Sequence, residues 1–393
     1  MEDKIGYCCA KGWRARIRQR MEGEMPEKYR QGIVVLVAFL ALSAVGLLAT
    51  TATGATRAPG TAKLDTIRIA ISPYVDESMI EVGIKKGFFT KLGIDLKVSQ
   101  TDWAPGQELL LGGHLDVTGA CEGDVMTMDV QNNQYTLAFP FYWFAGSALM
   151  YNPNRYPQWK TYSQFLAQTH NKHTALRMAL LQLKGKKIGL SAAGGAELAT
   201  LTGMANYASL PMSTFTTIDL QQANMPAALV AGSIDTFVSD VPSRIAVARR
   251  GYKALVEQTT LPWTIAHCGY AARRDWVDSH LDLAKRFQEG IFQTVTYITN
   301  NNTAAFPILS AALLKGGNKI TPADLKNVWN TMEIFGGSKG WFDSNVVSPK
   351  GQFYWKKRLT TVYGQIQKSG KSIKNLTSLN SLYYGLKIVA STP

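Results

Sequence analysis

The chain contains, at residues 67–98, the stretch IRIAISPYVDESMIEVGIKKGFFTKLGIDLKV. Its first five residues, IRIAI, form a short, mainly apolar run that is rich in β-branched side chains. Such a run is typical of a buried strand. Residues 76–87 then place apolar side chains at helical spacing and end in glycine. Residues 93–98 alternate at a period of two, so they predict a second strand. Strand, helix and strand in this order predict a parallel βαβ unit and an α/β fold.

The same pattern continues and then repeats. A helix at 106–113 and a strand at 115–119 complete the first set, and a second set covers 186–240. There we predict strands at 186–190, 214–220 and 234–240, and helices at 195–210 and 225–232. LLGGHLDV at 110–117 corresponds to LVAGSIDT at 229–236. Two similar halves predict two α/β lobes, each a mostly parallel sheet flanked by helices.

The chain after residue 251 has a different pattern. Residues 263–273 form an apolar extended run, and helices are predicted at about 281–299, 304–314 and 322–332. The third helix has a clear start, with Thr321 as the N-cap and Pro322 as the first helical residue. The remaining tail also has a mostly helical pattern. These helices have no sheet of their own, so we expect them to pack on the two lobes.

Composition excludes several classes of protein. The chain has 393 residues, of which 46% are hydrophobic, so it is not a mainly disordered chain. Its net charge is +14, but the basic residues are dispersed and form no nucleic-acid-binding motif, so no nucleic-acid partner is expected. Cys121 and Cys268 are the only cysteines after the N-terminal region. They can bond in an oxidising compartment, but the sequence does not show whether they lie close together.

Residues 1–60 have the pattern of an export segment. A basic region precedes the uncharged apolar run at 33–49, and small residues follow it. That run is also just long enough to span a bilayer, so cleavage near Ala52 or Ala55 and retention as a membrane anchor both remain open, with cleavage favoured. Either case predicts that the chain after Arg57 lies in the periplasm or on the outer face of the cytoplasmic membrane.

The sequence contains few residues or motifs that point to catalysis. The chain has no G-x-S-x-G nucleophile motif, no phosphate-binding P-loop and no dinucleotide-binding glycine motif. His170 and His173 form H-x-x-H in a polar segment without a neighbouring carboxylate or cysteine. We therefore predict a binding protein rather than an enzyme, with no cofactor and no metal site.

Several motifs together point to a family. They are S-P-Y-x-D-E after the first strand, GIKKGFFTKLGIDLKV, a G-x-x-D-V strand, LKGKKIGLSAAGGAE and ALVAGSID-x-F-V-S-D-x-P. Between about residues 67 and 253 the chain resembles the solute-binding proteins of ABC importers in the nitrate, sulfonate, taurine and thiamine-pyrimidine group. The resemblance implies a type II periplasmic-binding-protein fold: two lobes, 64–148 with 266–393 and 149–265, joined by two crossing strands around a ligand cleft. It also implies an ABC permease and its ATPase subunits as partners.

The carboxyl ends of the strands in the two lobes then face the cleft. The turns after these strands, together with the aromatic residue Tyr142, give the candidate ligand-binding residues. They are Ser72, Tyr74, Cys121, Glu122, Tyr142, Ser191, Gly194, Gly195, Glu197, Ser239 and Asp240. The glycine-rich turn before a helix suits an anionic group, and Glu122 and Asp240 are the acids best placed to pair with an amine. A ligand carrying both signs of charge, such as an aminosulfonate, fits both features. A turn without a ligand and an aromatic core cluster are the structural alternatives.

The leading hypothesis is an exported, monomeric binding protein that captures a sulfonate, taurine, nitrate or pyrimidine-like solute. A membrane-anchored ligand sensor is the alternative if residues 33–49 are retained. A pyrimidine-synthase-like enzyme on the same fold is less favoured, because the clustered cysteines of those enzymes are missing. The crossing strands are expected near residues 145–152 and 261–269, where they would form a hinge.

Overall fold

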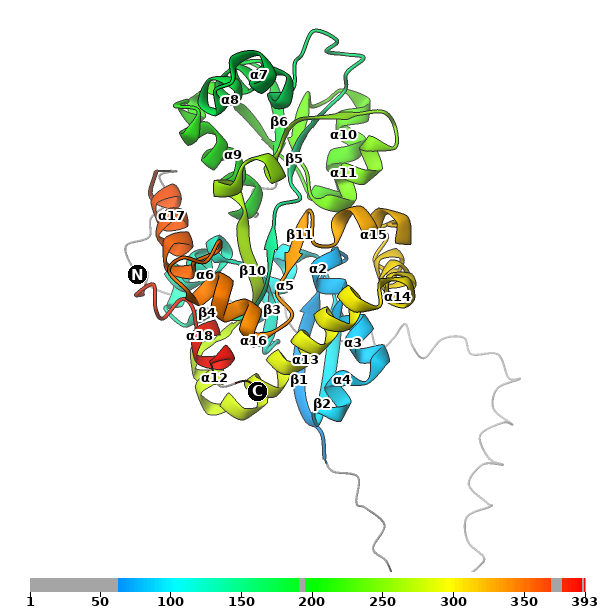
Figure 1. Ribbon diagram of the computed structural model, residues 1–393, viewed down its shortest axis with the longest axis vertical. Coiled ribbons are helices and arrows are strands. Elements are labelled where there is room, and N and C mark those ends of the chain that lie inside the picture. Colours follow the sequence, from blue (N-terminus) through cyan, green and yellow to red (C-terminus); the bar gives the residue numbers. More distant parts are fainter. Residues whose placement is uncertain (1–62, 191–194, 369–376, 391, 393) are drawn as a thin grey trace, which may run out of the picture. The chain divides into compact units, whose positions relative to one another are not determined.

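Two β-sheets organise the chain (Figure 1). The computed structural model describes residues 63–190, 195–368, 377–390 and 392, and within the unit formed by residues 61–393 the strands divide between these sheets. The export segment at 1–60, its apolar run at 33–49, Ser191 and Gly194 lie outside the described residues. Among the helices that are described, none combines the length and the apolar character needed to cross a membrane.

The first sheet has the strand order β11-β4-β10-β3-β1-β2. We call this sheet and the helices packed on it the first lobe. Its strands are β1 (Asp65–Ile71), β2 (Ile94–Gln100), β3 (Val117–Cys121), β4 (Tyr135–Phe144), β10 (Ala266–Arg273) and β11 (Glu333–Phe335). Its helices are α2 (Val75–Ser78), α3 (Ile80–Lys86), α4 (Phe88–Lys91), α5 (Trp103–Leu111), α6 (Glu122–Asn132), α12 (Arg274–Ser279), α13 (Leu281–Asn300), α14 (Asn302–Lys315), α15 (Pro322–Val328), α16 (Lys339–Phe342), α17 (Trp355–Lys368) and α18 (Gly385–Val389).

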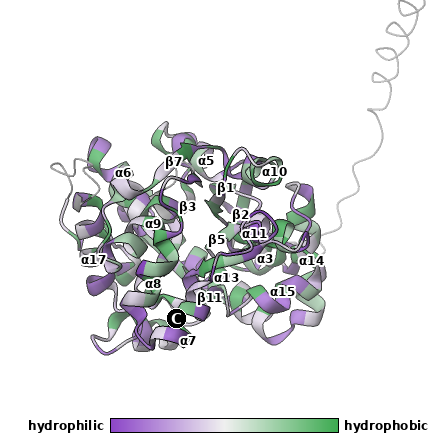
Figure 2. Cartoon of the chain, turned by 90° about the horizontal axis from the view of Figure 1, so that it is seen from above, coloured by the Kyte–Doolittle hydropathy of each residue, from purple (hydrophilic) through white to green (hydrophobic). Residues whose placement is uncertain are grey.

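The second sheet has the order β7-β6-β8-β5-β9 and forms the second lobe. Its strands are β5 (Ala148–Tyr151), β6 (Lys187–Leu190), β7 (Thr216–Asp219), β8 (Thr236–Val238) and β9 (Lys253–Glu257). Its helices are α7 (Tyr162–Thr169), α8 (Lys172–Leu181), α9 (Gly195–Tyr207), α10 (Met225–Ala231) and α11 (Val241–Ala248). Seen from above, the helices around the strands carry both hydrophilic and hydrophobic residues, as expected for helices with one buried face (Figure 2).

The opening βαβ unit forms as the sequence predicts. β1 pairs with β2 in parallel from Asp65↔Ile94 to Ile71↔Gln100, and the side chains of Ile67, Ile69 and Ile71 are buried. The predicted helix at 76–87 is divided into α2 and α3. It stops at Gly87, whose φ of +73° is a left-handed conformation that glycine adopts without strain.

The two corresponding segments of the sequence have equivalent places in the two lobes. Each ends its helix at a glycine with positive φ, +74° at Gly113 and +75° at Gly232. The aspartate that follows accepts a hydrogen bond from another strand of its own lobe: Asp116 from the backbone N–H of Arg68 in β1 at 2.7 Å, and Asp235 from that of Lys187 in β6 at 2.8 Å. The repeated sequence pattern therefore marks a repeated structure, in which a carboxylate fixes the helix end to the sheet.

The chain passes between the lobes twice. It leaves the first lobe after β4 and enters the second at β5, and it returns at β10, which is antiparallel to both β3 and β4. Ala266 at the start of β10 pairs with Phe144 at the end of β4, so the two crossings lie side by side (Figure 1). Cys121 and Cys268 are opposite each other in the β3–β10 register and form a disulfide, which the sequence had left open.

The C-terminal helices pack on the first lobe, and α17 also contacts α9 of the second lobe. α13 buries Phe287, Ile291 and Val295 in the same core cluster as β1. α15 begins at the predicted cap, where the Thr321 hydroxyl accepts from the backbone N–H of Asp324, but it ends at Val328 rather than 332. The chain then forms the unpredicted edge strand β11, which pairs with β4.

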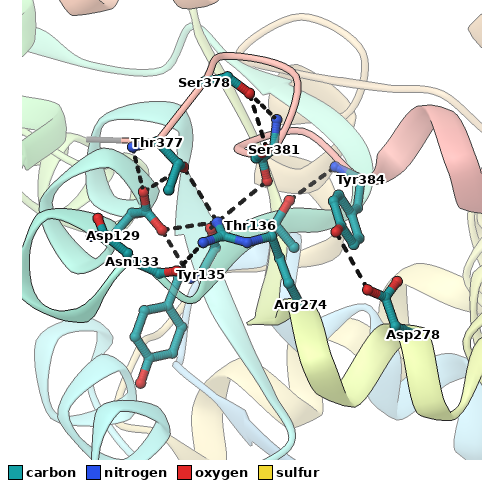
Figure 3. Close-up of polar contacts among 10 residues, drawn as sticks. All are labelled: Asp129, Asn133, Tyr135, Thr136, Arg274, Asp278, Thr377, Ser378, Ser381 and Tyr384. Atoms are coloured by element: carbon teal, nitrogen blue, oxygen red, sulfur yellow. Dashed lines mark hydrogen bonds and ion pairs between the residues drawn. The ribbon is translucent and has the colours of Figure 1, made fainter. Parts of the chain in front are cut away.

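A group of polar contacts, which we call the C-terminal clasp, holds the described tail from residue 377 onward (Figure 3). Asp129, which is fully buried, lies 2.9 Å from the guanidinium of Arg274. The backbone N–H and the hydroxyl of Thr377 donate to the same carboxylate at 3.1 and 2.6 Å. Arg274 also donates to the carbonyl of Tyr135 at 2.7 Å. Every partner comes from within the first lobe, so the clasp is a structural element.

Candidate functional site

A cavity of about 510 Å³ lies between the lobes. The first lobe contributes Tyr74, Asp76, Asp102, Trp103, Ala104, Pro105, Glu108, Cys121, Tyr142, Phe144 and Glu333. The second lobe contributes Glu197, Gln221, Gln222, Asp240, Val241 and Pro242. These residues come from the ends of strands and the starts of helices in both lobes, the position at which α/β sheets bind ligands.

Four aromatic side chains form part of the wall. Tyr74 and Trp103 meet edge to face with their ring centroids 6.3 Å apart. The hydroxyl of Tyr74 donates to Asp102 at 3.1 Å, and Asp102 in turn caps α5 by accepting from the backbone N–H of Trp103. Tyr142 and Phe144 come from the carboxyl-terminal half of β4. The rings give the cavity flat apolar surfaces that are fixed by packing and by hydrogen bonds.

Two buried carboxylates of the first lobe reach the cavity. Asp76 is 4% exposed and Glu333 is 1% exposed, and within the described part of the chain Asp76 Oδ1 and Glu333 Oε2 have no hydrogen-bond partner. Burial raises the pKa of Asp76 to about 6 and that of Glu333 well above its usual range, where the charge of Asp76 adds to the effect.

Glu77, the residue after Asp76, is also buried. It accepts hydrogen bonds from the backbone N–H of Ser72 at 2.5 Å and from the Ser72 hydroxyl. Burial, followed by the charge of Asp76, raises the pKa of Glu77 to about 8. Asp76 therefore repels both Glu77 and Glu333, and each of the three carboxyl groups retains its proton to a higher pH than in an unfolded chain.

The second lobe adds two more acids. Glu197 lies in the first turn of α9, and Asp240 caps α11 by accepting from the backbone N–H of Ser243 at 2.6 Å. Burial raises the pKa of Glu197 to about 7 and that of Asp240 to about 6. Repulsion from Asp102 raises both pKa values further, so the acids of the two lobes share one electrostatic environment.

The lining is acidic and has no basic counterpart. Among the described residues that line the cavity, six are aspartate or glutamate and none is lysine, arginine or histidine. No group of three or more histidine, cysteine, aspartate or glutamate side chains in the described part of the chain has a geometry that can hold a metal ion. The site can therefore bind a ligand through carboxylates, amides and aromatic rings.

Of the residues nominated from the sequence, five line the cavity: Tyr74, Cys121, Tyr142, Glu197 and Asp240. Ser72 does not line it, because its backbone and hydroxyl are bonded to Glu77. Ser239 is also buried away from it, and its hydroxyl donates to the carbonyl of Ala148 at 3.0 Å. Gly195 is the first residue of α9, two positions before Glu197, while Ser191 and Gly194 lie outside the described residues.

Glu122, which the sequence nominated as a carboxylate for a ligand amine, does not line the cavity. Its side chain is 2% exposed and forms an ion pair of 2.6 Å with Arg358 from α17, and it also accepts from the backbone N–H of His267. An arginine from the tail had no recognisable signal in the sequence. Glu122 therefore anchors α17 to the first lobe.

Sequence reasoning missed several acids of the cavity. Asp76 follows the S-P-Y turn after β1, so its position at a strand end was a usable signal. Asp102 and Glu108 belong to α5, whose predicted start at residue 106 came too late to place Asp102 at a helix cap. Glu333 had no signal, because it lies in a strand of three residues that directly follows the predicted helix at 322–332 and was not itself predicted.

A family model is matched by residues 60–310, a span that includes both crossings and every strand except β11. The chain belongs to the NMT1-like family. A search of curated protein sequences finds no match.

Solved structures similar to this NMT1-like chain share its fold. The alkanesulfonate-binding protein SsuA of Xanthomonas axonopodis pv. citri, bound to MOPS, superimposes with a TM-score of 0.61 at 14% identity, covering 80% of this chain and 97% of that one. The aliphatic sulphonate-binding protein SsuA of Escherichia coli gives 0.60 at 12% identity, with 81% and 91% covered. The nitrate-binding protein NrtA of Synechocystis PCC 6803 gives 0.55 at 16% identity, with 80% and 92% covered. The predicted periplasmic-binding-protein fold is therefore confirmed.

Proposed function

We propose that the protein is the exported solute-binding component of an ABC importer. It captures a small solute in the cavity between its lobes and delivers the solute to a permease that is driven by ATPase subunits. The observation that carries the proposal is the cavity itself, because residues of both lobes line it. A ligand that touches both lobes favours their closed arrangement, which a permease can recognise.

Two further observations support the proposal. The Cys121–Cys268 disulfide is of a kind that persists in oxidising compartments such as the periplasm. The structural neighbours include binding proteins for sulfonate and nitrate. The described cavity offers no nucleophile activated by a neighbouring base, so we propose binding without turnover.

A ligand screen tests the proposal. The chain from about residue 60 onward, with its disulfide intact, is heated with single small solutes. A true ligand at about one hundred times its Kd stabilises the fold by about 2.7 kcal/mol. The complex should show one site per chain by calorimetry, a smaller radius of gyration by X-ray scattering, and release of the solute chemically unchanged. Conversion of the solute, or saturation without any change in dimensions, would contradict this function.

A further inference from the structure

We propose that the solute is a small organic cation, with an ammonium, amidinium or quaternary ammonium group on an apolar body, and that the carboxylates of the cavity bind its charge. The inference rests on the proposed solute-binding function and names the chemical class of its ligand. It differs in sign from the sulfonate and nitrate named for the structural neighbours.

The first argument is the state of the buried carboxylates. Asp76 and Glu333 line the cavity and are almost fully enclosed by protein, and each has one buried oxygen that accepts no hydrogen bond from the described residues, although Asp76 is also hydrogen-bonded to Tyr142. A carboxylate oxygen without a donor is costly to bury. A positively charged group in the cavity would supply the missing charge, and N–H groups on it would also supply the missing donors.

The second argument is the distribution of charge. Asp76, Asp102 and Glu333 approach from the first lobe, and Glu197 and Asp240 approach from the second. A cation placed among them attracts both lobes at once. An anion in the same place meets carboxylates on both sides, and no basic side chain is present among the described lining residues.

The third argument is the nature of the walls. Tyr74, Trp103 and Tyr142 present aromatic rings to the cavity beside the acids. Aromatic faces attract cations and also pack against apolar groups. A cavity of about 510 Å³ with such walls suits an organic molecule rather than a bare metal ion.

Pairs of probes with nearly the same shape but different charge test the inference on the disulfide-bonded protein. Choline is paired with 3,3-dimethylbutan-1-ol, benzamidine with benzamide, and 1,4-diaminobutane with butane-1,4-diol; ethanesulfonate and nitrate are the anionic probes. At least one cation should bind, and its neutral partner and both anions should bind at least about thirtyfold more weakly.

The outcomes separate the two proposals. A neutral or anionic probe that binds as tightly as its cationic counterpart overturns the cationic ligand but leaves solute binding intact. Failure of every cation while an anion binds has the same meaning. Failure of all probes contradicts the cationic ligand and removes support from the solute-binding function as well.

Matched variants locate the charge effect. Glu333→Gln and Asp76→Asn should each weaken the best cation by at least about tenfold while leaving the weak binding of its neutral partner unchanged. Asp282→Asn removes the same charge from a side chain that is 86% exposed, so its affinities should equal those of the parent. If a first-lobe variant does not fold, Glu197→Gln provides the test from the second lobe. Unchanged cation affinity in the folded cavity variants would overturn the proposal.

Discussion

Two sets of buried carboxylates in the first lobe have opposite surroundings. In the C-terminal clasp, Asp129 has an arginine at 2.9 Å and accepts from both the backbone and the hydroxyl of Thr377 (Figure 3). In the cavity, Asp76 and Glu333 are equally well enclosed, but neither has a lysine or arginine beside it in the described part of the chain.

The difference shows how burial serves two purposes. A carboxylate with internal partners stabilises the fold as part of a network, and removing a partner leaves an uncompensated charge. A buried carboxylate with an unpaired oxygen and no cation beside it destabilises the ligand-free protein, and a ligand that brings the complementary charge would remove that cost. The same residue type therefore supports the tail at one place and, under the proposed function, lines the binding site at another.

The largest effect is expected from breaking the clasp. Arg274→Ala leaves the Asp129 carboxylate buried without its cation, so the free energy of unfolding should fall by about 3–5 kcal/mol. Urea denaturation at pH 7.5 measures the change. The neighbouring Arg273→Ala is the matched control, because Arg273 pairs with Asp275 at the surface and should cost less than about 1 kcal/mol. Equal losses in both variants would show that the clasp is no stronger than a surface pair.

A smaller change in the free energy of unfolding is expected when only the pH is changed. Between pH 6.5 and 8 the carboxyls of Glu77 and Glu197, with pKa values of about 8 and about 7, lose protons in the folded protein, whereas in the unfolded chain they are already ionised. The folded state therefore binds more protons, and the free energy of unfolding should fall by roughly 1–3 kcal/mol across this range. Thermal unfolding of the ligand-free protein at constant ionic strength measures it.

Other titrating groups change the free energy of unfolding mainly outside the range from pH 6.5 to 8. Burial lowers the pKa of His267, so its contribution raises stability with pH only below about 6.5. Asp235 and Asp324 have lowered pKa values, and the stability that they contribute is lost only in more acidic solution. Stability that stays constant or rises from pH 6.5 to 8 would mean that the cavity acids are compensated.

The smallest effect is expected from neutralising one cavity acid. Asp76→Asn removes a buried charge next to Glu77, so at pH 8 the ligand-free protein should become more stable by roughly 1 kcal/mol, with little change at pH 5. Asp129→Asn should have the opposite sign at pH 8, because it weakens a satisfied ion pair. Urea denaturation of both variants at pH 5 and pH 8 measures the two changes in the free energy of unfolding. If both variants are destabilised at pH 8, the clasp carboxylate and the cavity carboxylates do not differ in the way described.

Much of the fold was accessible from the sequence because its signals are local. Period-two alternation located β2, capping residues located α15, and the repeated Gly-x-x-Asp pattern located equivalent helix ends in both lobes. Four of the five nominated residues that line the cavity were located because strand ends in α/β folds meet at one edge, and the fifth, Tyr142, was nominated as an aromatic residue. Each of these inferences needed only neighbouring residues and a general rule of topology.

The remainder depends on contacts between distant residues. Glu122 looks like a free acid until Arg358, far along the chain, is placed beside it. Glu333 enters the cavity only because a three-residue strand adds to the edge of β4. The Cys121–Cys268 bond likewise follows from the antiparallel register of β3 and β10. No local pattern carries such information.

The pairing of Phe144 with Ala266 has a consequence for how the second lobe is connected to the first. Within the first lobe, β4 and β10 pair in an antiparallel manner like the two strands of a β-hairpin. The whole second lobe occupies the place of the loop that would connect them. Every strand of the first sheet lies outside residues 145–265, and the disulfide joins β3 to β10 close to the point of re-entry. The second lobe is thus an insertion into the chain of the first: the six of the seventeen cavity-lining residues that it supplies enter through two adjacent junctions, and the order of the first sheet does not depend on them.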